Sequence, residues 1–302
     1  MRPASIRQDG QSFRPFARAR VRPVTSSTPD ALWSSQAIRL LHPAAVVCER
    51  VRRRVGRENL LERVDLQVLV GARLLLVAVP DASGSTLLRV LAGLAHADGG
   101  RFHLAGALGP DASPAGWARR IAYVGPEPGL FLWMSADETL TLSSRLIGLE
   151  RGEAGRRMEQ VIERWGLAAG RDRPMSRLGL AYMQRTAMAA AMLGDPEVVL
   201  LDEPLRALDP DERVRLLRLP GERRTVVLAS RYPASEAGVV NQVALLQNGR
   251  VELHAPTSAL QEHGLPLSLR SIQTLAGMMA VRREAARHAT TKPITAEHTA
   301  SA

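Results

Sequence analysis

The sequence is almost without lysine: only Lys292 occurs in a chain of 302 residues that carries 40 basic side chains. It also has a single cysteine, Cys48, which excludes an internal disulfide and a metal centre built from several thiolates. No stretch of about 18 consecutive apolar residues occurs, so we expect no segment that spans a bilayer. The 45% of hydrophobic residues instead favours a globular fold with a large core in one or two domains.

Acidic residues are scarce near the N-terminus. Residues 1–57 hold twelve arginines and three acidic residues, which accounts for +9 of the net charge of +10. Within this part, residues 1–45 contain scattered Pro and Ser and no periodic apolar face, so we predict a disordered basic extension. Such an arm attracts anionic lipid or nucleic acid. Because arginine replaces lysine throughout the chain, we interpret the excess as compositional and do not expect nucleic acid as a partner.

Short apolar runs alternate with helical patterns over residues 46–255. Apolar strands that each end in polar residues and alternate with helices indicate an α/β fold with a parallel sheet covered on both faces. One of the helical patterns begins at Ser85, and Asn248-Gly249 predicts a hairpin. Residues 256–302 predict a C-terminal helix, near residues 269–286, and a polar tail.

Three polar segments follow predicted strands, and in a parallel sheet ligands bind where the strands end. These segments are PDASGST (80–86), DEP (202–204) and SRY (230–232). The acidic pair Asp202 and Glu203 is suited to hold a magnesium-bound water and to polarise an attacking water. The alternative interpretation is that charged residues simply end this strand.

Five further segments follow one another in chain order: GSTLLRVLAGL (84–94), RRIAYVGPEPGLFLWMSADETL (119–140), MQRTAMAAAMLGDPEVVLLDEPLRALDP (183–210), TVVLAS (225–230) and VALLQNGRVELHAP (243–256). In this order they resemble the nucleotide-binding subunits of ATP-binding-cassette (ABC) transporters over residues 46–255. The resemblance implies a P-loop NTPase-like parallel sheet core, an inserted helical subdomain at about 127–182 and an N-terminal antiparallel β part. The second segment and the helical region are most similar to exporter-type cassettes.

The resemblance also implies ATP and Mg²⁺ as cofactors and assigns residues to them. Five positions would contact the nucleotide: Ser83, Gly84, Ser85, Thr86 and Asp209. Ser85 and Asp202 would hold the metal. Glu203 matches the family's catalytic glutamate, and Arg231 falls where the family has its switch histidine.

Most of the family's other functional positions are replaced in this sequence. The family's phosphate loop reads G-x-N-G-x-G-K-S-T, but residues 79–86 lack the lysine and two of these glycines. Val55 stands where the family has an aromatic residue that stacks on adenine, and Pro126 stands where it has a Gln that contacts magnesium. Residues 178–182 stand where the family has its L-S-G-G-x signature. We expect Arg89 to point away from the loop. Backbone amides at 83–86 would then bind nucleotide weakly, with little or no hydrolysis, as in a pseudo-ATPase.

The interpretation we favour is a cassette subunit that forms a homodimer or a heterodimer and docks a membrane permease. Residues 126–167 would form the groove for that partner, and the subunit would lie in the cytoplasm on the inner face of the cell membrane. One alternative is a regulatory or scaffold protein, unrelated to transport, on a cassette fold. Another is an active ATPase in which Arg89 or Arg231 contacts phosphate. The last alternative is a plain parallel-sheet domain whose motifs resemble those of the family by coincidence.

Overall fold

The computed structural model describes residues 43–104, 107–108, 120–221 and 223–290. The predicted extension, residues 1–45, therefore lies outside the described residues except for its last three positions. The end of the predicted polar tail, residues 291–302, also lies outside them. The proposed domain boundaries at 45 and 255 stay predictions.

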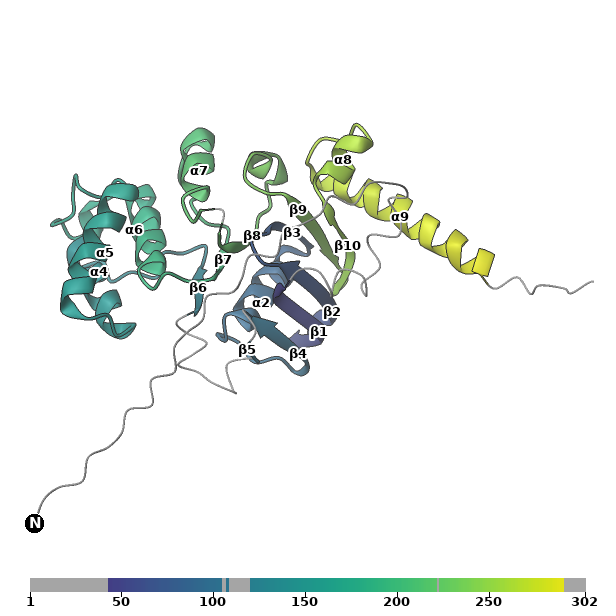
Figure 1. The fold of residues 1–302 in the computed structure, drawn as a ribbon, viewed down its shortest axis with the longest axis horizontal. Coiled ribbons are helices and arrows are strands. Elements are labelled where there is room, and N and C mark those ends of the chain that lie inside the picture. Colours follow the sequence, from purple (N-terminus) through teal and green to yellow (C-terminus); the bar gives the residue numbers. More distant parts are fainter. Residues whose placement is uncertain (1–42, 105–106, 109–119, 222, 291–302) are drawn as a thin grey trace, which may run out of the picture. The chain divides into compact units, whose positions relative to one another are not determined.

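The described strands form one sheet (Figure 1). They are β1 (Ala44–Val55), β2 (Glu58–Leu69), β3 (Arg73–Val79), β4 (Gly99–Leu104), β5 (Ala107–Leu108), β6 (Ile121–Val124), β7 (Val198–Asp202), β8 (Thr225–Ala229), β9 (Gln242–Gln247) and β10 (Arg250–Pro256). Their spatial order is β5-β4-β1-β2-β10-β9-β3-β8-β7-β6.

The sheet has a parallel part and an antiparallel part. Strands β9, β3, β8, β7 and β6 run parallel to one another, and β10 pairs antiparallel with β9. Strands β5, β4, β1 and β2 are antiparallel, and one pair, Arg250 with Arg63, joins them to β10. Between β9 and β10, Asn248 and Gly249 both have positive φ, as a tight hairpin turn requires. The predicted fold class, a parallel core with an N-terminal antiparallel β part, is confirmed.

Helices cover this sheet or stand beside it. The longer ones are α2 (Asp81–Leu91), α4 (Ala136–Leu146), α5 (Arg151–Arg164), α6 (Leu180–Met192), α7 (Pro210–Leu217), α8 (Ser258–Glu262) and α9 (Leu269–Thr290). Helices α4, α5 and α6 lie together next to β6, as the predicted inserted helical subdomain requires (Figure 1). Among the described helices, none combines the length and the apolar character needed to cross a bilayer.

Strand β3 is the centre of the core because both of its faces are buried. Leu75 and Val77 belong to the hydrophobic cluster that includes the α4–α6 helices. Leu74 and Leu76 point to the opposite face, where α2 packs with Leu87 and other apolar residues. A strand buried on both sides explains the unbroken apolar run LLLVAV (74–79), which is not typical of a half-exposed strand. The polar residues that follow β3, β7 and β8 therefore reach one edge of the sheet.

Candidate functional site

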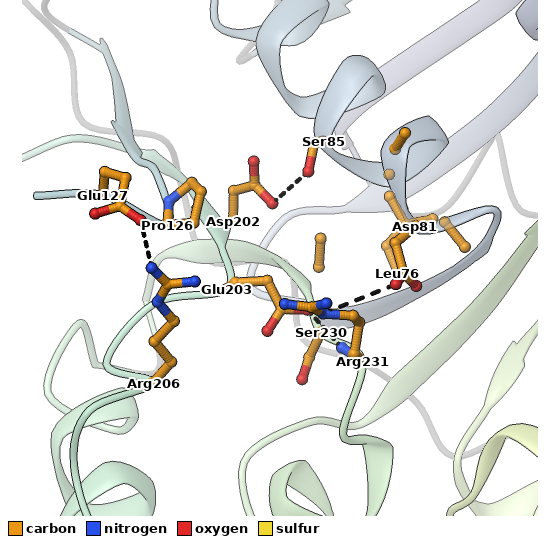
Figure 2. Close-up of a pocket in the computed structure, with 14 residues that line it drawn as sticks. Leu76, Asp81, Ser85, Pro126, Glu127, Asp202, Glu203, Arg206, Ser230 and Arg231 are labelled. Atoms are coloured by element: carbon orange, nitrogen blue, oxygen red, sulfur yellow. Dashed lines mark hydrogen bonds and ion pairs between the residues drawn. The ribbon is translucent and has the colours of Figure 1, made fainter.

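The three predicted polar segments meet in one cleft of about 200 Å³. Asp81 and Ser85 come from the start of α2, Asp202 and Glu203 from the end of β7, and Arg231 from the segment after β8 (Figure 2). Pockets that enclose drug-sized ligands usually measure about 300–1,000 Å³. The sequence therefore predicted correctly that the three segments lie together, and the cleft that they form is small.

The connection between β3 and α2 explains part of this small size. Strand β3 ends at Val79 and α2 begins at Asp81, so Pro80 is the whole connection. A phosphate-binding loop needs several residues between strand and helix to surround its anion. The prediction that the helix begins at Ser85 is wrong by one turn, because Pro80 and Asp81 already supply helix-start signals.

The early start of α2 also changes which backbone amides are free. Pro80, at the N-cap, has no N–H, and the Ser83 amide donates to Pro80 O over 3.0 Å. Amides from Gly84 onward lie inside the helix, where the i→i−4 bonds use them. The amides predicted to face an anion, at 83–86, are thus engaged, and those of Asp81 and Ala82 remain.

Ser83 and Gly84 have packing positions in the structure. Ser83 is fully buried and does not line the cleft, and its hydroxyl has no hydrogen-bond partner among the described residues. A Cβ on Gly84 would lie 3.1 Å from Ala78 Cβ and 3.7 Å from Ala229 Cβ. Gly84 therefore allows α2 to approach β3 and β8 closely. Thr86, the fourth predicted residue of this segment, is half-buried on α2.

Asp202 is buried, and both of its carboxylate oxygens accept hydrogen bonds. The Ser85 hydroxyl donates to Oδ1 over 2.9 Å, and the Tyr123 hydroxyl donates to Oδ2 over 3.1 Å. Burial is the main cause that raises the pKa of Tyr123, and the Asp202 charge adds to it. These two bonds tie α2 and β6 to the end of β7.

Arg89 lies on the same side of α2 as Ser85, since residues four apart share a helix face. Its guanidinium interacts first with the Tyr123 hydroxyl and then with the Asp202 charge, and both raise the pKa of Arg89. The side chain of Arg89 thus contacts β6 and does not line the cleft, and the expectation that it points away from the loop stays a prediction. Its interaction with Tyr123 places a positive charge beside the Asp202 carboxylate.

Glu203 adopts a left-handed backbone conformation, with φ +48°, directly after β7. Its Oε1 accepts a hydrogen bond of 2.6 Å from the Arg231 amide and lies 3.4 Å from the Arg231 guanidinium. Its Oε2 is buried without a partner among the described residues. Burial raises the pKa of Glu203, and the N–H and the charge of Arg231 offset part of this effect.

Ion pairs cross the cleft on two sides. Arg231 lies 3.8 Å from Asp81 as well as close to Glu203, so it links α2 to the end of β7 (Figure 2). Arg206 pairs with Glu127 on the opposite side. These pairs bring together residues far apart in the sequence and engage both arginines of the cleft with carboxylates.

The other predicted residues lie as follows. Asp209 is the N-cap of α7, and its side chain accepts a hydrogen bond of 2.9 Å from the Glu212 amide. Pro126 lines the cleft, whereas Val55 is exposed at the end of β1. The segment 178–182 leads into α6 and does not line the cleft.

Three residues in or beside the cleft were not predicted from the sequence as site residues: Tyr123, Glu127 and Arg206. Tyr123 lies near the end of a predicted strand, and this position was a signal that could have found it. Glu127 and Arg206 carried no local signal, because their pairing depends on how β6 and β7 are placed side by side.

The chain matches a family model described as ABC transporter over residues 61–206. It is 31% identical to the aliphatic sulfonates import ATP-binding protein SsuB 1 of Pseudomonas fluorescens over 218 residues, which are 70% of this chain and 77% of that protein. It is 30% identical to the sn-glycerol-3-phosphate import ATP-binding protein UgpC of Cupriavidus metallidurans over 202 residues, 65% of this chain and 54% of that one.

The chain spans only part of several relatives, such as 54% of UgpC and 66% of the sulfate/thiosulfate import ATP-binding protein CysA of Thermosynechococcus vestitus. These names describe import proteins and lend no support to the similarity with exporter-type cassettes noted in the sequence. Among solved structures, the ATP-binding subunit of an ABC transporter matches with a TM-score of 0.68 and 22% identity, over 77% of this chain and 99% of that one. A dimeric structure of an ATP-binding cassette bound to ADP and Pi matches with a TM-score of 0.62 and 21% identity, over 70% of this chain and 98% of that one.

Proposed function

This chain belongs to the ABC transporter family as an ATP-binding subunit, and on that basis we propose that it is a degenerate cassette subunit. In this proposal it binds Mg-ATP weakly or not at all, hydrolyses little or none, and works by dimerising and by docking a membrane permease. The residues at the cleft do not fit a magnesium-bound triphosphate. Three features support this statement: the short connection between β3 and α2, the charged groups that line the cleft, and the hydrogen bonds that Asp202 already accepts.

The single connecting residue between β3 and α2 is the observation that carries the proposal. With Pro80 alone between strand and helix, there is no loop whose amides can surround the β- and γ-phosphates. Each charge-assisted hydrogen bond to phosphate contributes roughly 1.5–3 kcal/mol. The absence of the lysine contact alone corresponds to a loss of about one to two decades in affinity.

The charges around the cleft also oppose a polyanion. Four carboxyl groups and two arginines line it: Asp81, Glu127, Asp202, Glu203, Arg206 and Arg231. Both arginines already pair with these carboxylates, so phosphate would have to break ion pairs before it could use them. Asp81 lies at the helix N-terminus, where its own charge competes for the remaining free amides. An active ATPase that uses Arg231 would need this arrangement to open.

Ser85 and Asp202 are the residues that would hold a divalent cation, since both offer oxygen ligands. Their side chains are 2.9 Å apart, but Tyr123 occupies the second Asp202 oxygen and Arg89 adds a positive charge nearby. Within the described part of the chain, no group of three or more potential metal-ligating side chains occurs. A cation bound here without phosphate ligands would therefore have few protein contacts.

An exposed apolar patch supports the docking role. Phe131, Leu132 and Trp133 are all about half exposed or more, and the rings of Phe131 and Trp133 lie 4.9 Å apart. They lie between β6 and α4, within the segment 126–167 that we predict to receive a permease. A contiguous exposed aromatic patch on a soluble surface is typical of a binding site for another protein. The names of the importing relatives favour a place in an import system, with the subunit on the inner face of the membrane.

The decisive experiment is a calorimetric titration of the purified chain with Mg-ATP, with the Asp202→Ala variant as control. We expect no binding at millimolar ATP. Micromolar affinity that is lost in the variant would overturn the degenerate reading. In that case turnover that disappears in Glu203→Gln would identify an active ATPase.

Docking is tested separately by co-purification from membranes of cells that produce the tagged chain. We expect a membrane-embedded permease to be retained and to be lost with Trp133→Ser, whereas Leu94→Ser, at an exposed apolar residue outside the segment 126–167, keeps it. Retention of a soluble partner or of nucleic acid in place of a permease would support the scaffold alternative.

A further inference from the structure

A second cleft, of about 230 Å³, lies away from the site described above. Helix α5 forms one wall, and the end of α6 forms the base. The segments that lead into β7 and β8 form the opposite wall, with Asp195, Leu219 and Arg224. The cleft thus lies where the helical subdomain meets the sheet, and it shares no lining residue with the Asp202 cleft.

The rim of this cleft is positively charged. Three arginines, Arg157, Arg164 and Arg224, line it together with one carboxylate, Asp195. Asp195 pairs with Arg224, so its charge is already compensated. Arg157 donates to Leu193 O over 2.7 Å and pairs with Glu153 at 2.8 Å, so its position is fixed.

Arg164 differs from the other two arginines. Its side chain is exposed, and no hydrogen bond or ion pair of it is seen within the part of the chain that the structure describes. It is the last residue of α5 and stands one turn of helix beyond the cleft residue Gln160, whose amide adds a hydrogen-bond donor. A guanidinium without a partner is free to bind a carboxylate through two parallel hydrogen bonds.

The floor of the cleft is apolar. Val161, Trp165 and Leu193 are buried there, and Met192 and Leu219 are partly buried beside them. Such a floor attracts a hydrocarbon body, while the rim selects a negative charge. The volume lies below the roughly 300–1,000 Å³ of pockets that enclose drug-sized ligands, which suits a short chain rather than a nucleotide.

We propose that this cleft binds a small organic carboxylate with a short apolar body, with Arg164 and Gln160 on the carboxylate and Trp165 beneath the hydrocarbon. A bound molecule would connect α5 and α6 to the segments that lead into β7 and β8. This cleft shares no lining residue with the nucleotide cleft or with the Phe131–Trp133 patch, although its α5 wall belongs to the segment 126–167 proposed to receive the permease.

The test uses the full chain and hexanoate as the probe, titrated at constant ionic strength and followed by calorimetry. We expect a Kd on the order of 1 mM, which lies within the ceiling of affinity per heavy atom for a ligand of this size. Hexan-1-ol should bind at least about tenfold more weakly, because it lacks the charge that pairs with Arg164. Inorganic phosphate should likewise bind more weakly, because it lacks the apolar body.

Two arginine variants locate the site. Arg164→Glu should weaken hexanoate binding at least about tenfold through charge reversal at the rim. Arg156→Glu, on α5 but outside the cleft, should leave it unchanged. Both arginines are exposed, so both variants are expected to fold. Absence of hexanoate binding, equal binding of hexan-1-ol or of phosphate, or equal losses in the two variants would each overturn the proposal.

Discussion

The Ser85 hydroxyl donates a hydrogen bond of 2.9 Å to Asp202 Oδ1, and this bond joins the first turns of α2 to the end of β7. Both residues were selected from the sequence as metal ligands. In the structure the bond links two elements of the core, and Tyr123 completes it from β6. Two residues that the sequence predicted to hold a cation thus join elements of the core.

Ser85→Ala should lower the free energy of unfolding by about 1–2 kcal/mol, because a buried carboxylate loses a donor. Thr86→Ala, its half-buried neighbour on α2, should change stability less. Thermal unfolding with and without millimolar Mg²⁺ is the measurement. We expect no effect of Mg²⁺ on the Tm of the native chain, since a ligand stabilises only where it binds. A Tm that rises with Mg²⁺ in the native chain but not in Ser85→Ala would show a working metal site.

Gly84→Ala should destabilise the chain by about 1 kcal/mol although alanine is the better helix former. The added Cβ would lie 3.1 Å from Ala78 Cβ, and neither Ala78 nor Ala229 has a flexible side chain that could move away. Gly155→Ala in α5 is the matched control, because a Cβ there has open space, and it should stabilise by about 0.5–1 kcal/mol. Urea unfolding of both variants measures the difference. Equal stabilisation by both would show that α2 is not closely packed on the sheet.

Glu236→Ala should cost about 3–5 kcal/mol of stability. Glu236 is fully buried, and it pairs with Arg213 and accepts a 3.1 Å hydrogen bond from Ser230. Its removal leaves the Arg213 charge buried without compensation. The exposed Glu62–Arg250 pair is the control, and Glu62→Ala should change the unfolding midpoint little because solvent screens that pair. Similar midpoints for the two variants would contradict this account.

Glu203→Gln should raise stability at pH 7–8 and have less effect as the pH falls below about 4.5. Burial raises the pKa of Glu203 above the ordinary value of 4.5, so the folded state disfavours its charged form. A raised pKa contributes stability that is present below the ordinary pKa and is lost as the pH rises through the folded value. The glutamine keeps an oxygen to accept the Arg231 amide. Thermal melts across this range measure the effect, and a gain that grows toward low pH would show the sign to be wrong.

The sequence predicted the parallel core because its strands carry a local signal. LLLVAV (74–79) and VVLL (198–201) are unbroken apolar runs that precede polar segments, and such runs suit a strand buried on both faces. The same signal located the cleft, since polar residues after parallel strands reach one edge. It could not predict the cross-cleft ion pairs, because the partners of Arg206 and Arg231 come from elements distant in the sequence.

The start of α2 was missed for a different reason. The resemblance to a phosphate loop predicted that the helix begins at Ser85. Pro80 followed by Asp81, however, is a common pattern at a helix start. Asp209 is a comparable case, because Asp before Pro210 with Glu212 three positions later is a typical helix N-cap. At both positions the sequence carries a helix-start signal as well as a match to the family's pattern.

The single residue between β3 and α2 has a consequence for any attempt to engineer a phosphate-binding loop at this position. Exchanging Ala82 or Gly84 for lysine would give a charge but no additional chain length, and α2 would still begin one position after Pro80. A phosphate-surrounding loop requires inserted residues or an unwound first turn, and unwinding would separate Asp81 from Arg231. No single substitution therefore supplies such a loop, and its construction requires an insertion.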